Sequence, residues 1–292
     1  MKFLAPAIAL FLALAHTLCS ALPADWTSPI EPFKISDNLY YVGSRDLAAY
    51  LVVTPQGNIL INANLDSSPP QIRSSVERLG FRWTDIRILL NSQAHYDHVA
   101  GAAQIIRETG AKQMVMDGDV DAIEHGGVTD FDPTLPRFPA SHVDRILHDN
   151  DTITLGGITL TAHKTAGHSR GCTTWTMQTQ AAGRTLNVVI VGGWVMNPGV
   201  LLQLVASHGK LEAYPAITTD FDHTFSALKN LPCDIFLGAH GGYFHLLDKL
   251  ERLTNEGTSV WIDASGYRTA VGKAENTYRK NLEQFRKPEP TN

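Results

Sequence analysis

Two histidines and an aspartate fall within four consecutive positions of this sequence, His95-Tyr96-Asp97-His98. The apolar run 86–90 comes shortly before them, and a run of this length that ends in polar residues is typical of a buried strand followed by a loop. In α/β folds, ligands and metals sit at the ends of strands. Imidazole nitrogen and carboxylate oxygen are ligands that a catalytic zinc prefers, so the motif favours a metal site over a polar surface turn.

Two further histidines stand in glycine-rich motifs after expected strands. His168 follows the expected strand 158–163, and His240 follows the expected strand 234–237. Gly167 permits a tight loop beside His168. One such histidine alone would more often be structural than a ligand, but three motifs at strand ends together indicate a metal centre. Because neighbouring residues of one turn cannot all reach one ion, we expect two metal sites, which in many hydrolases lie about 3.5–4 Å apart.

The 292-residue chain has the composition of an ordinary globular protein, with 43% hydrophobic and 18% charged residues. That is enough for a large core in one domain or two. The net charge of −5 provides no basic patch, so we expect no nucleic acid partner. In an oxidising compartment, Cys172 and Cys233 could form a disulfide or remain separate buried thiols.

The N-terminus is predicted to be a secretory signal peptide over residues 1–21. One positive charge in Met1-Lys2 precedes an almost wholly apolar stretch, and the small residues Cys19-Ser20-Ala21 suit cleavage after Ala21. The stretch is short for a membrane span, and no later segment approaches about 18 apolar residues. We expect the mature chain to be exported to a bacterial periplasm, without a membrane anchor after cleavage.

The order of elements predicts an αββα sandwich of the α/β class, with two mixed β-sheets face to face and helices outside. Antiparallel strands are expected between residues 33 and 61. A helix capped by Ser67 or Ser68 should then run through Leu79, followed by a strand over 86–90 and a helix over 99–109. Further strands are expected at 113–116, 143–147, 152–155, 158–163, 172–177, 186–191 and 234–237, and further helices at 118–124, 218–229, 246–255 and 267–285. No linker interrupts the mature chain, so residues 22–292 are expected to form one domain.

The three motifs His95-Tyr96-Asp97-His98, Gly167-His168-Ser169 and Gly238-Ala239-His240 together resemble the signature of the metallo-β-lactamase superfamily. The resemblance covers nearly the whole mature chain. It looks closest to subclass B3 on the segments Asp25-Trp26, Gly167–Trp175, Asn197-Pro198-Gly199, Tyr214-Pro215 and Leu231–Asp234. It implies an αββα fold with a shallow two-zinc cleft. It also implies a monomeric enzyme that hydrolyses the β-lactam ring of penicillins, cephalosporins or carbapenems and so confers antibiotic resistance.

The resemblance also implies two sets of zinc ligands. One site is built from Asp97, His98 and His240, and the other from His95, His168 and the residue at position 93. Most relatives have histidine at that position, whereas this chain has Gln93 and so looks like the minority GOB-type variants. A glutamine oxygen is a weaker zinc ligand than imidazole. Either Gln93 binds zinc weakly, or its site stays mostly empty while Gln93 bonds to nearby backbone; we favour partial occupancy, with one or two Zn²⁺ per chain.

In the reaction that the resemblance implies, Asp97 and His240 are the catalytic residues and the partner is a small β-lactam. The segment 194–196 is apolar, so stabilisation of the oxyanion is expected mainly from zinc. The substrate pocket is expected to contain Trp26, Tyr96, Trp194, Met196 and Asn197, together with the loop 131–138.

Two other functions remain open. Lactonases and thioesterases of the same fold place a bridging aspartate after a late strand, whereas the expected strand 186–191 is followed here by Gly192-Gly193-Trp194. The missing carboxylate argues against another exported hydrolase of this kind. A degenerate metal-binding protein without activity is supported only by Gln93, and the other five ligand positions argue against it.

Overall fold

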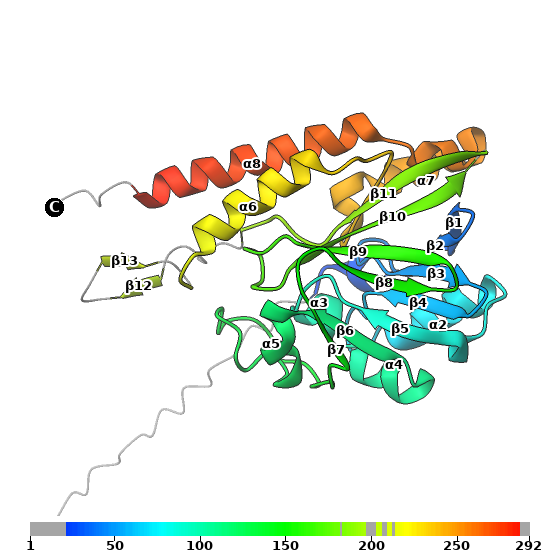
Figure 1. Cartoon of the computed structure of the whole chain (residues 1–292), viewed down its shortest axis with the longest axis horizontal. Coiled ribbons are helices and arrows are strands. Elements are labelled where there is room, and N and C mark those ends of the chain that lie inside the picture. The colour runs from blue at the N-terminus through cyan, green and yellow to red at the C-terminus, as the bar shows by residue number, and fades with distance from the viewer. Residues whose placement is uncertain (1–21, 182, 197–202, 206–208, 212–213, 287–292) are drawn as a thin grey trace, which may run out of the picture.

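A computed structural model of the chain shows two β-sheets face to face between two outer layers of helices (Figure 1). The structure describes residues 22–181, 183–196, 203–205, 209–211 and 214–286. The predicted signal peptide, residues 1–21, lies outside the described residues. The predicted αββα sandwich is confirmed.

The first sheet contains seven strands in sequence order, from β1 to β7. Strands β1 to β4 pair antiparallel, which confirms the meander predicted for residues 33–61, and β4 to β7 pair in parallel. The bounds are Phe33–Ser36 (β1), Leu39–Tyr41 (β2), Tyr50–Thr54 (β3), Gly57–Ile61 (β4), Ile86–Leu90 (β5), Lys112–Met116 (β6) and Arg145–Leu147 (β7). The carboxyl end of β5 therefore leads into the first histidine motif.

The second sheet has the order β14-β11-β10-β9-β8. Strands β11 and β14 are parallel, and the other neighbours are antiparallel. The bounds are Asp151–Leu155 (β8), Ile158–Lys164 (β9), Thr173–Ala181 (β10), Arg184–Val191 (β11) and Ile235–Gly238 (β14). The sequence did not predict a separate antiparallel pair, Gln203–Val205 (β12) and Gly209–Leu211 (β13).

Helices cover the outer faces of both sheets. Figure 1 shows α2 and α4 on the side of the first sheet and α6, α7 and α8 on the side of the second, with α6 packed along α8. The α-helices are Ala24–Thr27 (α1), Pro69–Arg78 (α2), Tyr96–Val99 (α3), Ala102–Thr109 (α4), Val120–Glu124 (α5), Ile217–Asn230 (α6), Leu246–Glu256 (α7) and Ala264–Arg286 (α8), and the 3-10 turns are Trp83–Asp85 (η1), Asp117–Asp119 (η2), Gly241–Phe244 (η3) and Gly257–Trp261 (η4). Within the described ranges, no helix is both long and apolar enough to cross a membrane.

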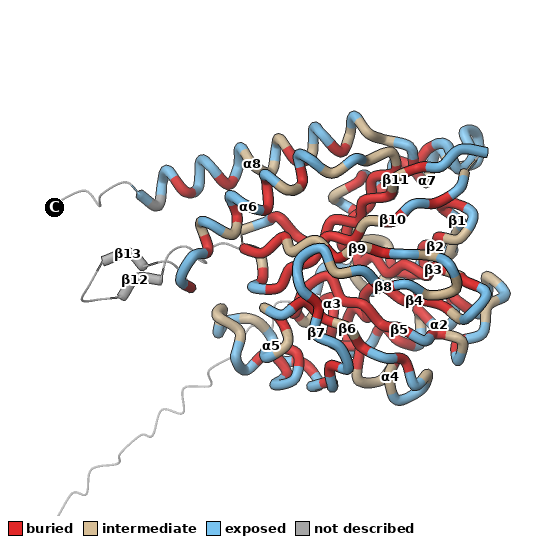
Figure 2. The backbone as a smooth tube through the Cα atoms, in the orientation of Figure 1, coloured by how far each residue is buried: buried red, intermediate tan, exposed pale blue. Residues whose placement is uncertain are grey.

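Alternation along the strands of the first sheet divides the apolar side chains between two cores. Tyr50 and Val52 of β3 belong to the larger core, which also holds Trp175 of β10, whereas Leu51 belongs to the core beneath α2 and α4. All four side chains are fully buried, and Figure 2 shows buried backbone running through the strands of both sheets. Because successive side chains of a strand point to opposite faces, a strand covered on both faces appears in the sequence as a continuous apolar run.

The polar motif after β5 is a helical turn, so the predicted loop followed by a single helix over 99–109 is wrong in detail. Helix α3 ends at Val99 and α4 begins at Ala102, because Gly101 donates its amide hydrogen to Asn64 O at 3.1 Å instead of continuing the helix. A Cβ at Gly101 would lie 2.4 Å from Ala63 O. Only glycine permits this close approach, which holds α3 against the end of β4.

Candidate metal centre

The three predicted motifs meet where the ends of strands from both sheets are joined by hydrogen bonds. Ser92, after β5, accepts a hydrogen bond from Thr173 N at the start of β10 (2.8 Å). The backbone N–H of Ser92 donates to Asn62 Oδ1 at the end of β4 (2.9 Å). Ala239, after β14, accepts a hydrogen bond from Ala48 N, which lies just before β3 of the first sheet (3.0 Å). These bonds bring side chains from sequence positions more than a hundred residues apart to one edge of the sandwich.

Asp97, His98 and His240, which we call the Asp97 group, form a compact set of possible metal ligands. His98 Nε2 lies 3.2 Å from His240 Nε2 and 3.3 Å from Asp97 Oδ2. His240 Nε2 lies 3.4 Å from the same carboxylate oxygen. Asp97 and His98 are buried, at 7% and 0% exposure. Two imidazole nitrogens and a carboxylate oxygen that converge in this way have the chemistry of a divalent metal site.

Asp46 fixes the orientation of His240, and the sequence did not indicate this role. The Oδ2 atom of Asp46 accepts hydrogen bonds from His240 Nδ1 (2.9 Å) and Trp26 Nε1 (3.1 Å), and its Oδ1 accepts one from Gly242 N (3.0 Å). His240 therefore presents Nε2 to the rest of the Asp97 group. A carboxylate behind a ligand imidazole fixes its tautomer and makes it a stronger base.

Gln93, His95 and His168, which we call the His95 group, lie in the same region. The rings of His95 and His168 have their centroids 4.6 Å apart. His168 Nδ1 donates to Val195 O (2.6 Å), so its Nε2 faces away from that loop. Gln93 Nε2 donates to Gly192 O (3.3 Å), while Gln93 Oε1 is buried without a hydrogen-bond partner in the described part of the chain. A buried polar atom without a partner is costly, and a bound cation would satisfy this oxygen.

The electrostatic states of the histidines differ between the two groups. Burial, reinforced by the neighbouring imidazole, lowers the pKa of His95 well below its usual value, and burial lowers the pKa of His168 to about 4. Burial also acts to lower the pKa of His240, but hydrogen bonds to Asp46 and Asp97 outweigh it and raise that pKa to about 9.

Asp97 keeps its negative charge although it is buried. Burial acts to raise the pKa of Asp97, yet its interactions with the neighbouring imidazoles of His98 and His240 outweigh burial and hold that pKa well below its usual value. At neutral pH, Asp97 is therefore ionised, and His95 and His168 are neutral. These are the protonation states that metal ligands need, whereas His240 must lose a proton when it binds a cation.

Asp119 is a second buried carboxyl whose role the sequence did not indicate. It accepts hydrogen bonds from Ser169 Oγ (2.7 Å) and Gly171 N (2.7 Å), which flank the tight turn after His168. A further hydrogen bond comes from the backbone of Ala94, so Asp119 connects two of the motifs. Burial raises the pKa of Asp119 to about 7, although these hydrogen bonds act to lower it.

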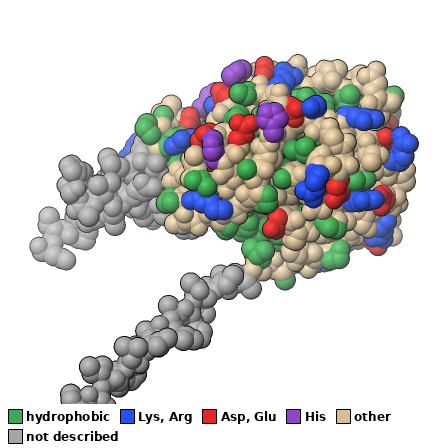
Figure 3. Space-filling view, turned by 90° about the horizontal axis from the view of Figure 1, so that it is seen from below, with side chains coloured by type: hydrophobic (Ala, Val, Ile, Leu, Met, Phe, Trp, Pro, Cys, Tyr) green, Lys and Arg blue, Asp and Glu red, His purple; other side chains and the backbone are tan. Residues whose placement is uncertain are grey.

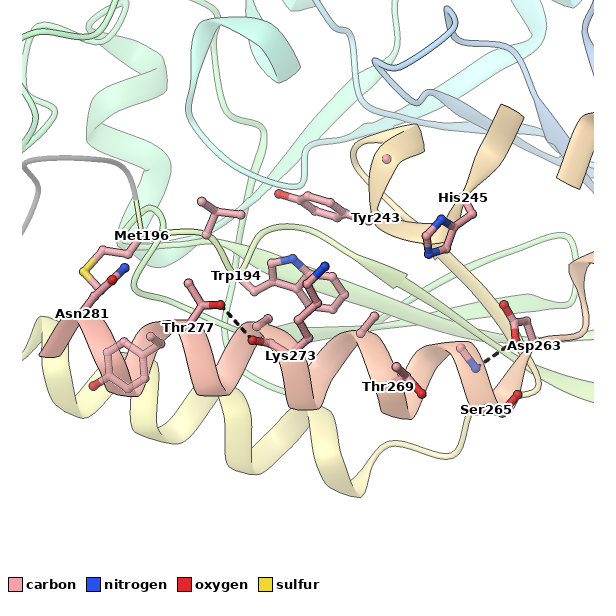
Figure 4. A pocket seen from close by; sticks show the side chains of 16 residues that line it. Trp194, Met196, Tyr243, His245, Asp263, Ser265, Thr269, Lys273, Thr277 and Asn281 are labelled. Carbon is pink, nitrogen blue, oxygen red and sulfur yellow. Dashed lines mark hydrogen bonds between the residues drawn. The ribbon is translucent and has the colours of Figure 1, made fainter. Parts of the chain in front are cut away.

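Four of the six candidate ligands, His95, Asp97, His168 and His240, line a cavity of about 570 Å³. Two of the predicted pocket residues, Trp26 and Tyr96, line this cavity, and so does part of the predicted loop 131–138. The predicted pocket residues Trp194 and Met196 instead line a neighbouring cavity of about 620 Å³ against α8 (Figure 4). The two cavities share Val195, Gly242 and Tyr243 as a wall. The predicted pocket residue Asn197 lies outside the described residues.

The two cysteines of the described chain are separate thiols, one of the two alternatives that the sequence left open. Cys172 is buried, and its Sγ donates a hydrogen bond to Gly193 O (3.6 Å). Burial raises the pKa of the Cys233 thiol to about 12. Neither thiol is positioned among the candidate ligands.

Basic and acidic side chains are mixed on the face of the molecule shown in Figure 3. Surface ion pairs of the described chain include Arg45 with Asp25 (2.8 Å) and Lys112 with Asp144 (2.9 Å). Exposed pairs of this kind contribute little to stability, about 0–1 kcal/mol each.

An αββα sandwich that gathers histidines and an aspartate at its joined strand ends defines a class of metal-dependent hydrolases. Residues 45–179 match the family model described as the metallo-beta-lactamase superfamily. The metallo-β-lactamase FEZ-1 from Legionella gormanii is 42% identical, with a TM-score of 0.84 over 89% of this chain and 98% of that one. The chain belongs to the metallo-β-lactamase superfamily, and it is a metallohydrolase of that family.

Two more solved structures support the same assignment. The class B3 di-zinc metallo-β-lactamase LRA-12 from an Alaskan soil metagenome is 36% identical, with a TM-score of 0.81 over 90% of this chain and 98% of that one. GOB-18 from Elizabethkingia meningoseptica is 34% identical, with a TM-score of 0.81 over 90% and 96%. A probable metallo-hydrolase of Burkholderia pseudomallei is 29% identical over 111 residues, 37% of this chain, so the chain spans about a third (36%) of the length of that curated relative.

Proposed function

We propose that this protein is a zinc-dependent β-lactamase, which hydrolyses the four-membered amide ring of β-lactam antibiotics. The observation that carries the proposal is the convergence of Asp97, His98 and His240 at the strand ends that also hold His95 and His168. The similarity to metallo-β-lactamases over nearly their whole length supports this substrate class.

Zinc fits the residues that are present. Four imidazoles and one carboxylate, without a thiolate, form the donor set of a catalytic zinc site. The ligand nitrogens are fixed from behind, by Asp46 for His240 and by the Val195 carbonyl for His168. Bound zinc acts as a Lewis acid and makes hydroxide available at neutral pH.

Gln93 is proposed to complete the His95 group with its side-chain oxygen. Its amide nitrogen is engaged by Gly192 O, and its oxygen is buried with no partner among the described residues. The hydrogen bond from Gln93 to the backbone is the contact expected from the sequence if Gln93 does not bind zinc. The unsatisfied oxygen nevertheless supports weak ligation and partial occupancy, because a neutral amide oxygen binds zinc less strongly than imidazole does.

Asp97 and His240 are assigned to the chemistry itself. The ionised Asp97 can accept a hydrogen bond from the attacking water and so orient it toward the carbonyl carbon of the substrate. Asp46 holds His240 beside Asp97 through its hydrogen bond to Nδ1. The proton for the departing nitrogen comes from water or from a polar group next to Asp97. Ser169 cannot act as a nucleophile, because it is 1% exposed and its hydroxyl donates to Asp119. Hydrolysis therefore proceeds without an acyl-enzyme.

The proposal is tested by turnover of the purified chain with zinc, using nitrocefin and imipenem beside an acyl-homoserine lactone and a thioester. We expect hydrolysis of the two β-lactams to exceed that of the other substrates. Asp97→Asn should abolish it, whereas Asp121→Asn, which removes an exposed carboxylate on α5, should leave it unchanged. Faster hydrolysis of the lactone or the thioester would replace the proposed substrate class, since these are the substrates of the alternative hydrolases.

Export is part of the same proposal and rests on the sequence of residues 1–21. We propose that the mature chain begins at Leu22 and acts in the periplasm. N-terminal sequencing of the protein from the periplasmic fraction tests this. An intact Met1 or a cytoplasmic location would contradict it.

A further inference from the structure

The cavity around the candidate metal centre has no lysine or arginine among the described residues that line it. During amide hydrolysis the carbonyl oxygen gains negative charge, and donors aimed at that oxygen lower the barrier. The nearby residues Trp194, Val195 and Met196 have no hydrogen-bond donor other than the indole nitrogen and the backbone. No cationic side chain of the cavity can therefore stabilise this negative charge. A neutral hydrogen-bond donor from another element could do so.

Tyr243 is placed to be this donor. It belongs to η3, three residues after His240, and it lines the cavity together with His95, Asp97 and His168. Tyr243 also lines the neighbouring cavity against α8, so its ring is part of the wall between the two. In Figure 4 the ring lies above Trp194 and its hydroxyl end points away from His245.

The ring of Tyr243 is held on three sides. Its centroid lies 5.0 Å from that of Trp194 and 5.4 Å from that of His240. It also packs on the backbone of Gly238, where an added Cβ would lie 2.8 Å from the tyrosine ring. A donor whose position is fixed before the reaction needs no reorganisation when charge develops, and this is the condition for effective electrostatic stabilisation.

The hydroxyl of Tyr243 makes no hydrogen bond to any described residue, and the side chain is partly exposed to the cavity. A phenol is neutral at neutral pH and donates one hydrogen bond. Tyr96 also lines the cavity and packs against the core beneath α2 and α4. Among the described residues, its one aromatic neighbour is Trp26, at a centroid distance of 6.0 Å. Of the two tyrosines, Tyr243 is the one whose ring also contacts a candidate ligand, His240, and it has a second aromatic neighbour in Trp194.

We propose that Tyr243 is a further catalytic residue, whose hydroxyl donates a hydrogen bond to the carbonyl oxygen of the substrate as that oxygen gains negative charge. The hydroxyl keeps its proton throughout, and the bonds that form and break are those of ordinary amide hydrolysis. The inference rests on the proposed β-lactamase function. In the hydrolysed product, one oxygen of the new carboxylate takes the place of the carbonyl oxygen, so the same hydrogen bond should also hold the product.

The test is Tyr243→Phe, which keeps the ring and its packing and removes only the hydroxyl. We expect kcat for benzylpenicillin to fall between about 10- and 100-fold, the range for one hydrogen bond to a charged group. KM should change less than about threefold, because the interaction forms as charge develops. The dissociation constant of benzylpenicilloate, the hydrolysed product, should rise about tenfold in calorimetry. The zinc content should equal that of the wild-type protein.

Tyr40→Phe is the matched control, because Tyr40 is a partly buried tyrosine that packs on Phe81 (5.0 Å), has no hydrogen bond from its hydroxyl to the described chain and lies outside the cavity. The proposal is overturned if kcat and product binding of Tyr243→Phe match those of this control. It is also overturned if lost zinc accounts for the lost activity, since Tyr243 would then act only through His240.

These outcomes separate the inference from the proposed function. A wild-type protein that hydrolyses no β-lactam refutes the proposed function, and binding of benzylpenicilloate then still decides the role of Tyr243. Equal binding by wild type and Tyr243→Phe, or no binding by either, overturns it. Loss of activity in Tyr96→Phe but not in Tyr243→Phe would assign the donor to the other tyrosine.

Discussion

Replacing Asp46 by asparagine should weaken the metal site at the Asp97 group without removing a ligand. The wild-type carboxylate accepts hydrogen bonds from His240 Nδ1, Trp26 Nε1 and Gly242 N. An asparagine of the same shape can direct its oxygen only to one side, so its NH2 group must face at least one of these donors. Losing such a partner behind a ligand histidine typically costs about 10- to 100-fold in metal affinity.

The size of this effect should depend on pH, and its sign follows from the pKa of His240. With a pKa of about 9, His240 must release a proton to bind metal, so at pH 7 the apparent affinity of the wild type is about 100-fold below its value at high pH. In Asp46→Asn the pKa of His240 falls toward its ordinary value, so protons compete less with zinc for the imidazole. The zinc affinity of Asp46→Asn should therefore be about 10- to 100-fold below that of the wild type at pH 9. This difference in affinity should be smaller at pH 7.

The assay is competition for zinc against a chromophoric chelator at pH 7 and pH 9. Asp25→Asn is the matched control, because Asp25 is an exposed carboxylate nearby that pairs with Arg45 (2.8 Å) and contacts no candidate ligand. Its affinity should equal that of the wild type at both pH values. Equal affinities of Asp46→Asn and the wild type at pH 9 would refute the assigned role of Asp46.

Three further predictions concern the other groups. Gln93→His should raise the zinc content toward two ions per chain without abolishing activity, as measured by metal analysis; an unchanged content would mean that Gln93 does not limit the His95 group. Asp119 keeps its proton to about pH 7 when folded but loses it near 3.8 when unfolded, so its burial costs stability as pH rises from 4 to 7, by up to about 4 kcal/mol. Asp119→Asn should lack that decline in urea unfolding at pH 5 and pH 8, and a parallel decline in both proteins would refute it. The first equivalent of zinc should enter the Asp97 group, so His98→Ala should weaken its binding and His168→Ala should not; the reverse order would contradict the charge argument.

The strands that carry the motifs were predictable because their physical signal is local. The buried strand β5 was predicted at its exact bounds, and the strands before His168 and His240 to within about one or two residues, since apolar runs ended at polar or glycine residues. The break at Gly101 was missed, because it depends on a hydrogen bond to Asn64 that exists only after folding. Glycine in a helical pattern is compatible with either outcome, and the tertiary contact decides.

The partners of the ligands could not be predicted from the sequence. Asp46 reaches His240 across 194 residues, and Asp119 reaches Ser169 across 50. Each is one aspartate among many acidic residues, in a turn without a characteristic spacing. The predicted pocket residues line two different cavities for a similar reason. Trp26 and Tyr96 line the metal cavity, but the chain turns after β11 so that Trp194 packs on Phe236 (6.0 Å between centroids) and lines the cavity against α8.

The two candidate ligand groups differ in charge, and under the proposed function this difference accounts for a working centre with glutamine at position 93. Asp97 and Asp46 place two carboxylates around His240, so a divalent cation at the Asp97 group is compensated where it binds. The His95 group offers only neutral donors, and its histidines owe their neutrality to burial. Replacing one imidazole by an amide weakens a site that already lacks a counter-charge, while the charged site keeps all its ligands. The chemistry assigned to Asp97 and His240 therefore depends on the group that the substitution leaves intact.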